Sequence, residues 1–286
     1  MNETTNNVAA WWVKIKNSTL TIQDIKLDPK VSSLDSVTEA YSNGVYTTFR
    51  TYQHDHVLLL ESHFNRLEES AKLVNGNILV PRNSLRVALR RILNDFCPDK
   101  DIRVRIALNL EDQSYIISAE PLKLLPASAY KKGVSVITYP LERKNPHAKT
   151  TDFITTADHI RNTLPPKIQE VIMVDENGCL LEGLSSNFWG VINGVVHTER
   201  EKALGGITRS VILELCKKES IPILLDSVNI RELSSLQEAF ITSTSRAVLP
   251  VTRIDHHLIG EGKPGKITQL LSKRYQEYVN HSIEKI

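Results

Sequence analysis

Cysteine is scarce in this sequence of 286 residues. It has three, Cys97, Cys179 and Cys216, which lie far apart and form no C-x-x-C pair. An odd and widely spaced set argues against a disulfide framework and against a structural zinc site. Reduced thiols of this kind are typical of a cytoplasmic protein, so we expect that location.

Long apolar runs and an excess of one charge are also missing. No stretch approaches the ~20 apolar residues of a membrane span, and Met1–Ala10 lacks the basic start and apolar core of a signal peptide. The formal net charge is +2, too small to recruit nucleic acid or an anionic membrane. With 41% hydrophobic and 24% charged residues, the composition is that of a globular protein, and the length suits two packed domains.

The order of hydrophobic patterns predicts a mixed α/β (α+β) fold. In the first half we expect a strand over 45–52, helices over 61–74 and 83–96, and a hairpin over 102–110 and 115–119. In the second half we expect strands over 134–139, 171–174, 179–192, 222–225 and 239–242, with helices over 157–162, from Ile207 and from about Lys266.

A break in both periodicities divides the chain. Leu124–Gly133 contains Pro126 and ends in glycine, so we place a linker at 124–133. The predicted domains are a small N-terminal α/β domain over 1–123 and a larger, strand-rich C-terminal domain over 134–286.

Side-chain periodicity assigns faces to the first elements. A period of two places Tyr46, Thr48, Arg50 and Tyr52 on one face of their strand, and Arg103 and Arg105 on one face of theirs. On the first helix, Leu60, Phe64, Leu67 and Ala71 form the apolar side, which predicts His63, Arg66 and Glu69 on another side.

Two short motifs are interpreted as structural. Gly260–Lys266, GEGKPGK, nearly matches the phosphate-binding loop G-x-x-x-x-G-K-[ST], but Ile267 follows it and Pro264 removes an N–H donor. We therefore expect a turn before the last helix. His256 and His257 are adjacent, so on a strand they point to opposite faces, and we predict no metal site.

Six further motifs occur in a fixed order along the chain. They are GVYTTFRTY at 44–52, HFNRLEESA at 63–71, HAKTTD at 147–152, LEGLSSNFWGV at 181–191, GGITR at 205–209 and FITSTSRAVLPV at 240–251. Together the motifs resemble the class IV (fold type IV) pyridoxal-phosphate-dependent aminotransferases, which include branched-chain aminotransferases, D-amino acid aminotransferases and 4-amino-4-deoxychorismate lyases. The resemblance spans most of the chain and implies a two-domain fold type IV architecture.

The resemblance implies pyridoxal 5′-phosphate (PLP) as cofactor and suggests a residue for each of its contacts. Lys149 corresponds to the Schiff-base lysine, whose freed amine would act as the general base. Glu182 corresponds to the carboxylate that keeps the pyridine nitrogen protonated. The implied phosphate ligands are Arg66, the N–H groups of Ile207 and Thr208 at a helix start, the Thr208 hydroxyl, and Thr244.

The predicted substrate pocket departs from the family's pattern. Thr47 stands where the family usually has Glu, Asp101 stands where branched-chain enzymes have Tyr, and Phe153 and Ile154 provide no hydroxyl for the cofactor's phenolic oxygen. Tyr46 is our candidate for that hydrogen bond. The predicted substrate-binding residues are Tyr46, Arg50, Arg103 and Ser245, with Arg105 and Arg246 as alternatives for the carboxylate. Each of these arginines could equally be part of a structural ion pair.

Three functions stay open at this point. The first is an aminotransferase of branched-chain or D-amino acid type, which moves an amino group between an amino acid or primary amine and a 2-oxo acid by a ping-pong mechanism. The second is a 4-amino-4-deoxychorismate lyase that eliminates pyruvate, and the third is a PLP-binding protein without turnover. The family is generally dimeric, so the resemblance implies a homodimer. We expect no nucleic-acid or membrane partner.

Overall fold

The computed structural model describes residues 8–16, 19–96 and 99–286. By its internal contacts the chain divides into two compact units. The first unit comprises Met1–Lys123, Ala148–Asp158 and Ser282–Ile286, and the second comprises Leu124–His147 and His159–His281.

This division differs from the predicted domains in three stretches. The predicted linker 124–133 belongs to the second unit and contains the short helix α4 (Ala127–Lys132). Ala148–Asp158 belongs to the first unit because its backbone bonds to the start of a strand there: the N–H of Tyr46 donates to the Lys149 carbonyl at 2.9 Å. The C-terminal strand β16 (Ile283–Lys285) joins the first unit because it pairs with β4 (His56–Leu58).

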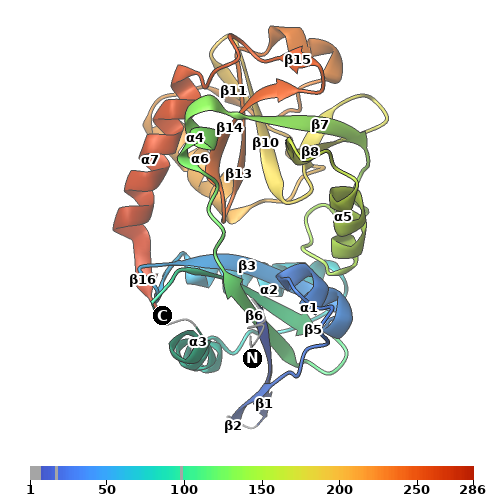
Figure 1. The fold of residues 1–286 in the computed structure, drawn as a ribbon, viewed down its shortest axis with the longest axis vertical. Helices are drawn as coiled ribbons and strands as arrows, with labels where there is room; N and C mark the ends of the chain where they lie inside the picture. The colour runs from blue at the N-terminus through green and yellow to red at the C-terminus, as the bar shows by residue number, and fades with distance from the viewer. Residues whose placement is uncertain (1–7, 17–18, 97–98) are drawn as a thin grey trace, which may run out of the picture. The chain divides into compact units, whose positions relative to one another are not determined.

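The first unit is built on a seven-stranded sheet in the order β16-β4-β3-β5-β6-β1-β2, and Figure 1 shows β3, β5 and β6 side by side. Its other strands are β1 (Ala9–Lys16), β2 (Thr19–Asp24), β3 (Gly44–Tyr52), β5 (Ile102–Asn109) and β6 (Tyr115–Pro121). Alternation along β3 sends Val45 and Phe49 into a core with α2 (Leu60–Leu73) and α3 (Arg82–Phe96). It sends Tyr46 into a second core with α1 (Leu34–Tyr41).

The sequence misplaced one residue of α2. His63 was expected away from the apolar side, but it is 2% exposed. Its Nδ1 lies 2.7 Å from the hydroxyl oxygen of Thr47, which shares the core-facing side of β3 with Val45 and Phe49. The hydroxyl gives the buried imidazole a hydrogen-bond partner, which removes most of the cost of burying it.

The second unit is built on a nine-stranded sheet in the order β12-β11-β10-β13-β14-β7-β8-β9, with β15 paired to β14. Because β9 also pairs with β10, the path from β10 through β13, β14, β7, β8 and β9 closes on itself. The strands are β7 (Val134–Pro140), β8 (Ile168–Val174), β9 (Leu180–Gly183), β10 (Ser186–Ile192), β11 (Val195–His197), β12 (Ile223–Leu224), β13 (Glu238–Ser243), β14 (Ala247–Ile254) and β15 (His257–Leu258).

The helices of the second half begin close to where the sequence placed them. Helix α6 (Ile207–Lys218) starts at the predicted residue, and so does α7 (Lys266–Ser282). Helix α5 (Asp152–Asn162) starts earlier than predicted and runs from one unit into the other. A 3₁₀ helix, η1 (Ile230–Ser235), completes the unit.

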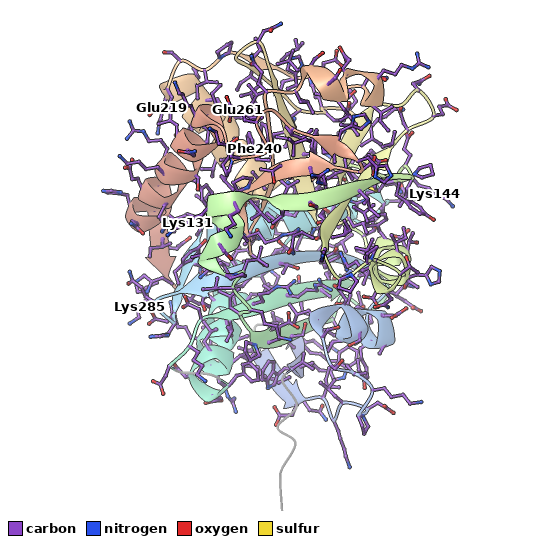
Figure 2. All side chains as sticks on the ribbon, turned by 45° about the horizontal axis from the view of Figure 1, so that its top comes forward. Lys131, Lys144, Glu219, Phe240, Glu261 and Lys285 are labelled. Atoms are coloured by element: carbon purple, nitrogen blue, oxygen red, sulfur yellow. The ribbon has the colours of Figure 1, made fainter. Side chains whose placement is uncertain are left out.

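The GEGKPGK stretch is the turn that the sequence predicted. Gly260 and Gly262 have φ of 51° and 71°, in the left-handed region that favours glycine. Lys263 pairs with Glu261, which is labelled in Figure 2, and the two side chains are 71% and 77% exposed. The lysine therefore faces solvent beside a carboxylate.

Cys179 and Cys216 are free thiols, and burial raises the pKa of Cys216 to about 12. Cys97 lies outside the described residues. Within the described ranges, no group of three or more His, Cys, Asp or Glu side chains is arranged to hold a metal ion. A helix both long and apolar enough to cross a bilayer is not found in that part of the chain either.

Candidate active site

The backbone of Lys149 is fixed on both sides. Its N–H donates to the Ser70 hydroxyl at 3.1 Å, and its carbonyl accepts the N–H of Tyr46 at 2.9 Å. Its Nζ lies 4.7 Å from the centre of the Tyr46 ring. The first unit therefore brings together two of the predicted residues, the lysine and the tyrosine, and holds the lysine main chain against α2 and β3.

The buried side chain of His63 is subject to the charges of two nearby cations. Burial, together with the charges of Arg66 and Lys149, lowers the pKa of His63 to about 3. His63 is therefore a neutral group at physiological pH, flanked by two cations that both act on it. This places Arg66 and Lys149 in one electropositive neighbourhood of the first unit, which suits an anionic ligand.

Glu182 is the penultimate residue of strand β9 in the second unit, and its carboxylate is surrounded by donors. Its Oε1 lies 3.3 Å from Nη1 of Arg143, and the two side chains are 4% and 7% exposed. Its Oε2 accepts from Nδ2 of Asn187 at 3.2 Å and from the N–H of Leu204 at 3.0 Å. These bonds replace the water that a buried carboxylate loses.

The start of α6 presents N–H groups without a side-chain cap. Gly206 is the N-cap residue and makes no side-chain hydrogen bond, and the first N–H groups of a helix have no carbonyl of their own helix to bond. Thr208 is 4% exposed and Arg209 is 8% exposed. For the buried Nε of Arg209, no hydrogen-bond partner is found among the residues that the structure describes. This donor-rich start of a helix suits a phosphate group.

Thr244 and Ser245 lie in the turn between β13 and β14. Arg246 fixes this turn, since its Nη2 donates to Glu170 Oε2 and to the Ser185 hydroxyl, each at 2.8 Å. Burial alone would raise the pKa of Glu170, but the charges of Arg246 and Arg161 outweigh it and hold that pKa below its ordinary value. Glu170 is therefore an ionised partner of Arg246, and it ties this turn to the turn between β9 and β10.

Each arginine suggested for the substrate carboxylate pairs with a carboxylate of the protein. Arg50 lies 3.3 Å from Asp101, Arg103 lies 2.6 Å from Glu120, and Arg105 lies 2.6 Å from Asp35. Arg105 also donates to Thr48, Thr38 and the Leu34 carbonyl. The geometry of Arg105 and Arg246 favours the structural alternative, whereas the substrate roles of Arg50 and Arg103 stay predictions.

Sequence reasoning missed four polar residues of these clusters: Ser70, His63, Arg143 and Asn187. Ser70 follows His63 by seven residues, a spacing that repeats the same side of a helix, so the HFNRLEESA motif held a usable signal. Asn187 lies inside the LEGLSSNFWGV motif, although nothing there indicates its partners. No pattern marked Arg143, which lies in the polar loop before Lys149.

The chain is similar to known proteins over most of its length. Residues 44–254 match the family described as amino-transferase class IV. A branched-chain-amino-acid aminotransferase of Pseudomonas aeruginosa is 26% identical over 85% of this chain and 86% of its own length. A D-alanine aminotransferase of Staphylococcus epidermidis is 26% identical over 90% and 95%.

A solved structure supports the fold. The branched-chain amino acid aminotransferase of T.th., determined with pyridoxamine 5′-phosphate, superposes with a TM-score of 0.75 at 21% identity and covers 97% of this chain and 98% of that one. The prediction of a mixed α/β protein of fold type IV is confirmed. Because the family match covers well over half of the sequence, the chain belongs to the class IV aminotransferases, which depend on PLP.

Proposed function

We propose that this class IV aminotransferase binds PLP covalently through Lys149 and moves an amino group between an amino acid and a 2-oxo acid. The observation that carries the proposal is the placement of Lys149, whose main chain is bonded on both sides and whose Nζ lies against the Tyr46 ring. A lysine held in this way can present its amine repeatedly in one position, which covalent and general-base catalysis require.

The residues of the second unit fit the two polar ends of this cofactor. The bound cofactor would supply an electron sink at Cα of the substrate, and Glu182 would keep its pyridine nitrogen protonated. In this unit Ile207, Thr208 and Thr244 would hold the phosphate, because N–H groups at a helix start and hydroxyls donate to a phosphate dianion. In the first unit, Arg66 is the proposed phosphate ligand, since a guanidinium also donates to such a group. The buried Nε of Arg209 in the first turn of α6 is the supporting observation for an anion there.

Proton movement falls to Lys149 in this proposal. Its free amine would act as the base that takes the proton from Cα of the substrate and delivers it to C4′ of the cofactor. The Ser70 and Tyr46 bonds keep its main chain fixed during both steps. Tyr46 would also donate to the phenolic oxygen of the cofactor.

We propose an amino acid with an uncharged side chain as substrate. The named relatives act on branched-chain amino acids or D-alanine, all uncharged in the side chain. Each candidate arginine is paired with a protein carboxylate, so it would share its guanidinium with that partner, which disfavours a second carboxylate on the substrate side chain. Ser245 would contact the one carboxylate of such a substrate, and Arg50 or Arg103 would contact it while keeping its protein partner. We also propose that the protein is a cytoplasmic homodimer. Sedimentation at micromolar concentration tests whether it is a dimer.

A donor and acceptor panel tests the activity. L- and D-forms of alanine, leucine and glutamate and (R)- and (S)-amines are each paired with pyruvate and 2-oxoglutarate. The proposal expects amino transfer with alanine or leucine of one handedness, and no transfer in Lys149→Ala. Lys144→Ala is the matched control, because Lys144 is an exposed lysine of the preceding loop and is labelled in Figure 2.

Two results would contradict the proposal. Pyruvate release from 4-amino-4-deoxychorismate without any amino acceptor would identify the lyase instead. Bound PLP without turnover of any donor would identify a binding protein.

A further inference from the structure

One buried side chain, Asn187, contacts both cofactor contacts that we propose in the second unit, the Glu182 carboxylate and the start of α6. Nδ2 of Asn187 donates to Glu182 Oε2 at 3.2 Å and to the Leu204 carbonyl at 2.7 Å. The N–H of Leu204 donates to the same Glu182 oxygen at 3.0 Å. The three groups therefore form a closed ring of hydrogen bonds, in which both N–H groups of the Asn187 amide are used.

The other end of the Asn187 amide lies against the start of α6. A Cβ atom added to Gly206 would overlap Oδ1 of Asn187, so position 206 accepts only glycine while the asparagine keeps its place. Gly206 is the N-cap of α6, directly before Ile207 and Thr208. Through its two ends, the Asn187 amide contacts both the Glu182 carboxylate and the N-cap of α6.

The asparagine has little freedom to give way. Asn187 is 5% exposed and Glu182 is 3% exposed, so water cannot easily replace their mutual bond. The two residues are direct partners across the β9–β10 pair, and Asn187 is also paired with Thr242 on β13. Its backbone is therefore fixed from both sides.

We propose that Asn187 is a positioning residue that couples the Glu182 carboxylate to the phosphate-binding start of α6. The inference rests on the proposed function, since it concerns the two PLP contacts assigned to this unit. A shift of the helix cap would move the Asn187 amide and hence the carboxylate, and the reverse holds as well. The ring end and the phosphate end of the cofactor would then bind cooperatively.

The test compares PLP with pyridoxal, the same ring without phosphate, on the apoenzyme. The ratio of the dissociation constant of pyridoxal to that of PLP measures how much the phosphate adds to binding. The pH midpoint of the bound cofactor's visible absorption measures the environment of its ring. Asn187→Ala should weaken pyridoxal binding, lower the ratio about tenfold, a loss of about 1.4 kcal/mol, and shift the midpoint.

Asn187→Asp is the second variant, because it keeps the shape of the side chain but loses both N–H donors and places a negative charge beside Glu182. It should also change this ratio of dissociation constants, and it should shift the pH midpoint of the absorption further than Asn187→Ala does. Thr198→Val is the matched control. Thr198 is 3% exposed and donates to the Phe188 carbonyl at 2.9 Å, so its loss removes a buried bond of the same strand without touching Glu182 or α6. It should lower the melting temperature and leave the ratio and the midpoint unchanged.

The coupling is overturned if the Asn187 variants weaken pyridoxal binding but keep the phosphate ratio, since the residue would then serve Glu182 alone. It is also overturned if they behave like Thr198→Val. Failure of the proposed function looks different, because it appears in the wild-type protein: either no visible cofactor band forms on Lys149, or the band forms and the donor panel gives no amino transfer.

Discussion

Helices α6 and α7 start in nearly the same way and meet different partners. Each has a glycine before its first residues, Gly206 or Gly265, and each has an Ile-Thr pair in its first turn. At α7, the Glu238 carboxylate accepts the N–H of Ile267 at 3.0 Å and the N–H of Thr268 at 2.7 Å. At α6 the N-cap residue is Gly206, which makes no side-chain cap hydrogen bond.

The two helix starts differ in the strand residue that packs against the glycine. A Cβ on Gly265 would overlap Glu238, and one on Gly206 would overlap Asn187. A carboxylate can accept helix N–H groups, whereas the amide N–H groups of Asn187 donate to Glu182 and Leu204 instead. One helix thus has its anion built into the fold, and we infer that the other takes its anion from the cofactor.

The largest expected effect is at the glycines. Gly206→Ala should displace Asn187 and weaken PLP binding by about 2 kcal/mol, roughly 30-fold in the dissociation constant. Gly265→Ala should displace Glu238 and lower the free energy of unfolding by a similar amount, while PLP affinity of the folded protein stays the same. Fluorescence titration and denaturant unfolding measure the two quantities. Equal losses of PLP affinity in both variants would remove the distinction.

The next largest effects are expected at the threonines in the first turns, Thr208 of α6 and Thr268 of α7. Thr208→Val removes a hydroxyl proposed to bind phosphate and should weaken PLP about tenfold, or about 1.4 kcal/mol. Thr268→Val removes the hydroxyl that donates to Glu238 at 2.7 Å, so it should lower the melting temperature and leave PLP affinity intact. The comparison fails if Thr208→Val acts on stability alone.

A smaller loss of stability is expected when Glu238 loses its charge. Glu238→Gln keeps an acceptor but loses the charge that favours the positive end of α7, and it should cost about 1 kcal/mol of unfolding free energy. Urea denaturation measures the loss, and high salt should reduce it because salt screens the charge–dipole attraction. A change in PLP affinity would show that the α7 start also serves the cofactor.

The smallest effect is the response of the apoenzyme to inorganic phosphate. At a phosphate concentration equal to its dissociation constant, binding at α6 should stabilise the fold by about 0.4 kcal/mol. Differential scanning fluorimetry should show the shift for the wild type and for Thr268→Val, and a much smaller one for Thr208→Val. A shift that survives in Thr208→Val would place the anion elsewhere.

The sequence predicts the starts of α6 and α7 but not which of them is capped from within. Glycine before an apolar repeat is a local signal, so Ile207 and Lys266 could be identified as first residues. Glu238 lies thirty residues from Thr268 along the chain, and only the folding of β13 brings it there. Periodicity carries no information about such a partner.

The same limit applies to Lys149 and to the arginines. The 147–152 motif predicts Lys149 as the Schiff-base lysine, but its place in the first unit depends on backbone bonds to β3, about a hundred residues earlier in the chain. Alternation placed Arg103 and Arg105 on one face, yet their partners Glu120 and Asp35 come from β6 and α1. Patterns therefore predicted elements and faces, whereas ion pairs required the fold.

The most direct measurement is the site of covalent attachment of the cofactor. The PLP-loaded protein is reduced with borohydride, digested, and analysed by mass spectrometry. We predict one pyridoxyl label, on the peptide that contains Lys149, and loss of that label in Lys149→Ala. A label on another lysine, or none on a protein that has bound PLP, would contradict the account.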